Sequence, residues 1–93
     1  MIVVADTSPL RYLFLIDEIR LLPLLYQQIY IPTEVAAELT NPHSPPGLTH
    51  WMDSRPDWLE VRTVQTHRSE LAHLDSGERE AIELALECNI DTV

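Results

Sequence analysis

The feature that most constrains the fold of this chain is a repeated alternation of short apolar strands with amphipathic helices. Residues 2–5 form a continuous apolar run rich in β-branched side chains, which is typical of a strand buried on both faces. The run stops at Asp6, and helical spacing of apolar residues follows. Because strands that alternate with helices need crossover connections, the pattern predicts an α/β fold with a mostly parallel sheet flanked by helices on both faces.

The rest of the chain repeats this order. Ser8 is expected to be the N-cap of a helix with Pro9 at its first position and an end near Ile16. The further elements are expected, in chain order, as a helical stretch at 18–26 that Pro23 divides, a strand at 29–31, a helix from 32 to 39 or 40, a loop at 43–47, a short helix at 48–52, a strand at 59–64, a helix at 75–88 and half of a fourth strand at 90–93. The length fits one domain over residues 1–93, and a core this small favours a homodimer.

The charge of the chain restricts how it can contact nucleic acid. There are 15 acidic and 6 basic residues, which gives a net charge of −9, and every basic residue is an arginine. A field of this sign disfavours binding of phosphate backbones through a broad basic patch. If carboxylates hold a divalent cation, however, the ion inverts the sign that a phosphate meets locally.

Cysteine content and hydropathy bear on location. The single cysteine, Cys88, cannot form an internal disulfide, and the amino terminus lacks the pattern of a secretory signal. We therefore expect a cytoplasmic protein. No apolar stretch approaches the roughly 20 residues of a membrane-spanning helix, so no membrane partner is expected.

Asp6 is the first candidate for a site. In open α/β sheets, ligands bind outside the carboxyl ends of the strands, and Asp6 directly follows the first strand. The alternative is that Asp6 only caps the following helix, as aspartate often does.

The second candidate is Glu38. In the helix that begins at Pro32, the apolar stripe contains Val35 and Leu39, so Glu38 lies at its margin and Glu34 faces water. A carboxylate beside a buried face costs desolvation free energy unless it is paired, which favours Glu38 as a ligand. The alternative is an interfacial glutamate that reaches solvent.

The third candidate is Glu78, near the start of the last helix. If Ile82 marks the centre of the apolar stripe, Glu78 falls within it and points at the core, whereas Glu80, Glu83 and Glu87 fall on the solvated face. The alternative is a capping box, with Asp75 as the N-cap and Glu78 three residues later.

Three carboxylates that meet without a counter-ion repel one another. A cation resolves this repulsion, and oxygen-only ligation favours Mg²⁺ or Mn²⁺ over zinc, because no cysteine or histidine has zinc-like spacing. The four histidines are interpreted as surface residues.

Three motifs, in this order, carry a family resemblance. They are Val-Ala-Asp-Thr-Ser-Pro-Leu at 4–10, Ile31-Pro32 leading to Glu38-Leu39, and Gly-Glu-Arg-Glu-Ala-Ile at 77–82. The chain resembles the PIN-domain family, and in particular its bacterial branch of VapC-like toxins. The resemblance implies a metal-dependent endoribonuclease that cleaves RNA, is paired with a cognate antitoxin, and holds Mg²⁺ or Mn²⁺ with Asp6, Glu38 and Glu78. Thr7 or Ser8 would orient Asp6 or a water.

One departure leaves other functions open. Members of this family usually continue past the fourth strand, whose end supplies a further aspartate, whereas this sequence stops at Val93. We therefore expect a C-terminally truncated, PIN-like α/β domain. The alternatives to a toxin ribonuclease are an inactive PIN-like module that acts in dimerisation or protein binding, and an acidic interaction protein whose carboxylates are only surface groups.

Overall fold

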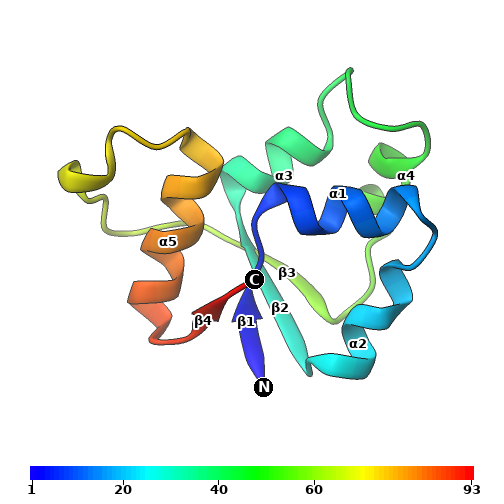
Figure 1. The fold of residues 1–93 in the computed structure, drawn as a ribbon, viewed down its shortest axis with the longest axis horizontal. Coiled ribbons are helices and arrows are strands. Elements are labelled where there is room, and N and C mark those ends of the chain that lie inside the picture. The colour runs from blue at the N-terminus through cyan, green and yellow to red at the C-terminus, as the bar shows by residue number, and fades with distance from the viewer.

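A four-stranded parallel sheet forms the centre of the fold (Figure 1). The computed structural model describes all of residues 1–93. The strands are β1 (Ile2–Val4), β2 (Gln28–Pro32), β3 (Leu59–Arg62) and β4 (Asp91–Thr92), in the order β3-β2-β1-β4. All three pairings are parallel. The predicted α/β class, with a parallel sheet, is confirmed.

Helices cover both faces of this sheet. They are α1 (Thr7–Leu15), α2 (Leu22–Leu25), α3 (Thr33–Leu39), α4 (Leu48–Asp53) and α5 (Ser76–Cys88), with 3-10 turns at η1 (Ile19–Leu21) and η2 (Ser69–Leu71). In Figure 1, α5 lies on one side of the strands and the other helices lie on the opposite side. None of these helices has both the length and the apolar composition needed to cross a membrane.

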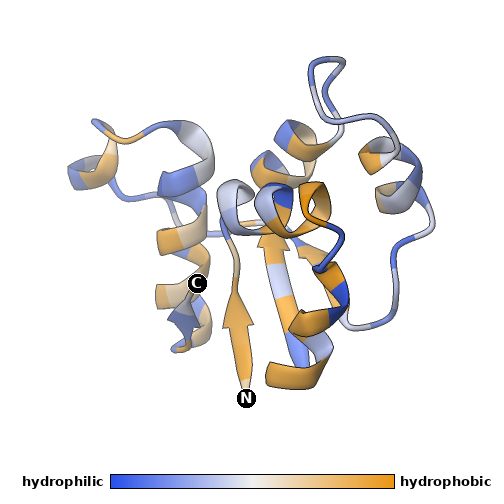
Figure 2. Ribbon diagram, turned by 45° about the vertical axis from the view of Figure 1, so that its right-hand side comes forward, coloured by the Kyte–Doolittle hydropathy of each residue, from blue (hydrophilic) through white to orange (hydrophobic).

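Alternation along β1 explains the two layers. Successive side chains of a strand point to opposite faces. Val3 belongs to a core cluster of 12 buried residues with Leu10, Val35 and Leu48, which come from α1, α3 and α4. Val4 belongs instead to a cluster of 5 buried residues that contains three residues of α5. Because both faces of β1 are buried, the strand is apolar along its length, as its colour in Figure 2 shows.

Several helix boundaries differ from the expectation by one or two residues, and two of them involve a cap or a proline. The first helix begins at Thr7 and has Asp6 as its N-cap, so Ser8 and Pro9 already lie in its first turn. An aspartate caps well, and a proline in the first turn removes an N–H that has no helical partner. In the stretch 18–26, the predicted division is present, but the second piece starts at Leu22, one residue before Pro23.

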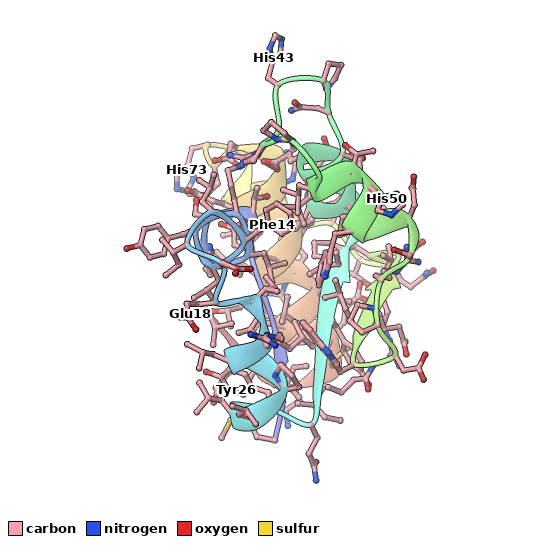
Figure 3. All side chains as sticks on the ribbon, turned by 90° about the vertical axis from the view of Figure 1, so that its right-hand side faces the viewer. Phe14, Glu18, Tyr26, His43, His50 and His73 are labelled. Atoms are coloured by element: carbon pink, nitrogen blue, oxygen red, sulfur yellow. The ribbon has the colours of Figure 1, made fainter.

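The histidines are at the surface, as predicted. All four are exposed, and Figure 3 shows His43 at the tip of the loop between α3 and α4. Phe14, also labelled there, packs against Trp51 with a ring-centroid distance of 6.3 Å. This contact ties α1 to α4 and supports the side of the sheet on which α3 lies.

Candidate functional site

The carboxyl ends of β1 and β2 bring two of the predicted acids to one place. These strands are neighbours, and Ala5 extends their pairing by donating its N–H to the carbonyl of Tyr30 at 3.0 Å. Asp6 follows at once, and α3 begins directly after β2. Glu38, in the last turn of α3, therefore lies near Asp6, although 31 residues separate Thr7 from Glu38 in the sequence.

Thr7 links these two acids. Its backbone N–H donates to Asp6 Oδ1 at 2.7 Å, and its hydroxyl donates to Glu38 Oε2 at 3.2 Å. The Thr7 side chain is buried, with 4% of the residue exposed. Arg11 adds a second tie, because its Nη2 donates to the carbonyl oxygen of Glu38 at 3.3 Å. Ser8, by contrast, is exposed and its hydroxyl makes no hydrogen bond.

The other oxygen of Glu38 has no partner. Oε1 is buried and accepts no hydrogen bond within the chain. The pKa of Glu38 is raised above its ordinary value of 4.5, first by burial and then by the negative charges of Asp75, Asp6 and Glu34; the hydrogen bond from Thr7 opposes the rise. An unsatisfied buried acceptor costs about 1–3 kcal/mol. A bound cation would satisfy this oxygen and offset the repulsion, so these residues fit a divalent metal ion.

Gly77 brings the start of α5 against this carboxylate. A Cβ atom built on Gly77 would lie 1.9 Å from Glu38 Oε1 and 2.9 Å from its Cδ. Any other residue at position 77 would therefore displace the Glu38 side chain. The close approach of α3 and α5 is supported by the Ser76 hydroxyl, which donates to Glu34 Oε1 at 3.0 Å.

Two glutamates expected on solvated faces take part in this contact. The Glu34 backbone N–H donates to Glu80 Oε1 at 3.3 Å, and both residues are half-buried. The periodicity of α3 or of α5 alone does not indicate that these side chains meet across the interface between the two helices.

Glu78 does not point at the core, contrary to the expectation. It is exposed, and its N–H donates to the capping oxygen of Asp75 at 3.0 Å, which is one of the two hydrogen bonds of the capping box given as the alternative. The buried stripe of α5 contains Gly77, Ala81, Leu84 and Ala85. Small residues let the helix approach the sheet and α3 closely, so the buried face of α5 is not centred on the larger Ile82, as was expected.

The carboxylates are gathered but do not form a ready-made metal centre. No group of three or more histidine, cysteine, aspartate or glutamate side chains is placed to hold an ion. Among the negative charges that raise the pKa of Glu38, the largest contributions come from Asp75 and then Asp6. Asp75, which was expected only as the N-cap of α5, is thus an acid at the start of this helix whose charge acts on Glu38.

Glu83 is the buried acid that sequence reasoning missed. It was expected in solvent, yet only 1% of it is exposed. Its Oε2 accepts from the Arg68 backbone N–H at 2.5 Å, and its Oε1 lies 3.2 Å from His67 Nδ1. Burial acts to raise the pKa of Glu83, but these hydrogen bonds and the nearby positive charges outweigh it and leave the pKa below 4.5.

Comparison with known proteins gives one match. The sequence model of a family described as a PIN domain matches residues 2–93. No curated protein and no solved structure matches the chain.

Proposed function

We propose that this chain, which belongs to the PIN-domain family, is a metal-dependent ribonuclease that holds Mg²⁺ or Mn²⁺ between the ends of β1 and α3 and the start of α5. PIN domains are generally nucleases and typically use divalent metals. The observation that carries the proposal is Oε1 of Glu38, a buried carboxylate oxygen without a hydrogen-bond partner among three further acids.

Glu38 and Asp6 are the two proposed metal ligands with direct structural support. Oxygen ligands of this kind suit Mg²⁺ and Mn²⁺. Thr7 fixes Oε2 of Glu38 with its hydroxyl and thereby leaves Oε1 for the ion. Asp6 has one oxygen committed to the Thr7 amide, and its second oxygen is available.

The third ligand comes, in this proposal, from the start of α5. The family resemblance assigns Glu78, whereas Asp75 is the α5 acid whose charge acts on Glu38. Asp75 also accepts from the Glu78 amide at 3.0 Å. We retain Glu78 as the family-based assignment, with Asp75 as its structural competitor.

The chemistry follows from the ligands. A divalent ion bound here would supply a water of lowered pKa and would stabilise negative charge on the phosphodiester that is attacked. Asp6 and Glu38 would hold the ion, and Gly77 keeps the space that the Glu38 carboxylate occupies. Ser8 is exposed beside Asp6, where its hydroxyl is free to bind a water or the substrate.

We further propose that the chain is a homodimer and the toxin of a toxin–antitoxin pair. Large apolar side chains support a partner surface: Leu15, Leu24 and Leu25 are 61%, 79% and 67% exposed. Figure 2 shows the turn of α2 coloured hydrophobic at the outside of the molecule. Exposed apolar residues in this number favour contact with another protein surface.

The absence of a ready-made cluster of three metal ligands favours a second candidate, an inactive PIN-like module that acts in protein binding. An RNA cleavage assay separates the two. Single-stranded RNA is incubated with the chain in Mn²⁺, in Mg²⁺ and in EDTA, together with the Asp6→Asn variant. Asparagine caps a helix as well as aspartate, so the variant should stay folded.

The ribonuclease proposal predicts cleavage that requires the metal and is lost in Asp6→Asn. Wild-type protein that binds Mn²⁺ but cuts no RNA at any metal concentration would establish the inactive module instead. Cleavage that survives both EDTA and the Asp6→Asn substitution would point to a contaminating nuclease.

A further inference from the structure

A pocket of about 390 Å³ lies beside α5, away from the Glu38 carboxylate. It is lined by His67, Arg68, Ser69, Ala72 and Arg79. In Figure 1, the loop that contains η2 lies at the left, beside the upper part of α5. The pocket is therefore formed between this loop and the first turns of the helix.

The pocket brings together two of the few basic residues of the chain. The chain has a net charge of −9 and only six basic residues, all arginines. Two of them, Arg68 and Arg79, line the pocket together with His67 and the hydroxyl of Ser69. An acidic surface repels phosphate, so a pocket lined by two arginines is the better place for this chain to accept an anion.

Buried Glu83 holds the wall of the pocket in place. Its carboxylate accepts from the Arg68 backbone amide at 2.5 Å, lies 3.2 Å from His67 Nδ1, and lies 4.0 Å from Arg79 Nε. These contacts fix the backbone at 67–68 and the stem of the Arg79 guanidinium. The negative charge of Glu83 also offsets part of the positive charge of Arg79.

The ends of the guanidinium groups are not held by hydrogen bonds within the chain. No hydrogen bond within the chain uses the terminal nitrogens of Arg68 or Arg79, or the hydroxyl of Ser69. Arg68 Nη1 faces only the exposed carboxylate of Glu70, at 3.6 Å. The contacts with Glu83 use the Arg68 backbone amide and Arg79 Nε. They therefore leave the terminal nitrogens of both guanidinium groups for a ligand.

We propose that this pocket binds a phosphate group of a single-stranded polynucleotide. The planar fork of a guanidinium matches the oxygens of a phosphate. Gly77 faces Glu38, and Arg79, two residues later, lies about 200° further around α5. The pocket and the carboxylate site thus lie on opposite sides of a helix about 10–12 Å across. A single-stranded polynucleotide that crosses the start of α5 would reach both. In assigning the ligand to a polynucleotide, this inference rests on the proposed function.

The test is binding of a fluorescein-labelled 2′-O-methyl oligonucleotide in EDTA, followed by fluorescence anisotropy. Arg68→Gln and Arg79→Gln should each weaken binding about tenfold. Each should also make the dependence of log K on log salt shallower by about 0.7, the value for one phosphate contact on a single strand. Arg20→Gln is the matched control, because Arg20 is exposed on η1, outside the pocket; it should change binding by about twofold or less.

Glu70→Gln tests the same pocket in the opposite direction. It releases Arg68 from its nearest carboxylate and should tighten binding at least about threefold relative to Glu18→Gln, which removes the same charge from an exposed position before η1. A gain in affinity cannot result from misfolding.

The outcomes separate this inference from the proposed function, because the binding test contains no divalent metal and needs no cleavage. Weaker binding in both arginine variants and tighter binding in Glu70→Gln support the pocket even if the chain cuts no RNA. Arginine variants that bind like Arg20→Gln overturn the assignment even if the chain is an active nuclease. If inorganic phosphate stabilises the wild type but not the arginine variants, while oligonucleotide binding is unchanged, the pocket takes free phosphate and the strand assignment is overturned.

Discussion

Gly77 leaves room for the carboxylate of Glu38, since a Cβ atom at position 77 would lie 1.9 Å from Glu38 Oε1. The same oxygen is buried and lacks a hydrogen-bond partner. Helices α3 and α5 thus meet at a carboxylate oxygen that has no hydrogen-bond partner in the fold. A local conflict of this kind is typical of a functional site, where stability is given up for binding.

Replacing Gly77 by alanine should separate stability from metal binding. Alanine has a higher helix propensity than glycine, by at most about 1 kcal/mol, and the Glu38 carboxylate can swing aside because it is the end of a flexible side chain. We expect the Tm of Gly77→Ala in EDTA to be no lower than that of the wild type, while the rise in Tm caused by Mn²⁺ falls by more than half. Differential scanning fluorimetry measures both.

Gly47→Ala provides the control. Gly47 has φ of +87°, where a side chain costs about 1–2 kcal/mol, so its Tm should fall while the Mn²⁺ response persists. A full Mn²⁺ response in Gly77→Ala would contradict the assigned role of Glu38.

The Glu38→Gln variant should be more stable than the wild type when no metal is present. The pKa of Glu38 is raised by burial and by Asp75, Asp6 and Glu34, so the charged form destabilises the fold at neutral pH. A gain of 1 kcal/mol corresponds to about 4–8 °C in Tm for a domain of this size, and we expect a gain of this order in EDTA at pH 7.

The difference in stability between the wild type and Glu38→Gln should depend on pH. The wild type should approach Glu38→Gln as the pH falls through the raised pKa toward 4.5, because Glu38 then takes up a proton. Thermal unfolding between pH 7 and pH 4 tests this. A Glu38→Gln variant that is less stable than the wild type at pH 7 in EDTA would show that the carboxylate is a structural group.

Glu83 should show the opposite dependence on pH. Its pKa is lowered in the folded state, so its contribution to stability is present above pH 4.5 and is lost as the pH falls through the lowered pKa. Glu83→Gln removes the buried charge that pairs with the Arg68 amide and His67, which should cost about 1–3 kcal/mol at pH 7. The difference in unfolding free energy from the wild type should shrink below pH 4.5.

Glu87→Gln is the comparison for this variant. Glu87 Oε1 also accepts from two backbone amides, those of Gln65 and Thr66, but Glu87 is exposed, so its loss should cost less. A Glu83→Gln deficit that stays constant from pH 7 to pH 3 would refute the account of the lowered pKa.

The exposed leucines of α2 should matter for assembly and not for folding. Leu24 and Leu25 are mostly exposed, so replacing both by glutamate removes little buried area from the single chain. If the chain is a homodimer through this surface, light scattering should show a dimer for the wild type and a monomer for the double variant, with unfolding still cooperative. Equal masses for the two proteins would exclude this surface as the dimer interface.

The sequence predicted the part of the site that depends on strand order. Asp6 and the helix of Glu38 each follow an apolar run, and parallel strands place their carboxyl ends at one edge. This rule needs no knowledge of side-chain contacts, and the contact of Thr7 with Glu38 is consistent with it. Whether Asp6 and Glu38 bind a metal stays a prediction.

The surroundings of α5 could not be predicted in the same way. The helix packs through Gly77, Ala81 and Ala85, and hydropathy gives small residues little weight in locating a buried face. The outer face is covered in part by the loop around His67 and Arg68, which buries Glu83. Periodicity within one helix indicates its own apolar stripe, but it carries no information on a loop that folds over the opposite face.

A crystal of the chain grown with Mn²⁺ tests the central claim most directly, because the anomalous signal of manganese locates the ion. We predict a peak that contacts Oε1 of Glu38 and a carboxylate oxygen of Asp6, with either Asp75 or Glu78 completing the site. No manganese peak beside Glu38, or peaks only at exposed carboxylates such as Glu60, would contradict the proposal that these acids hold a divalent ion.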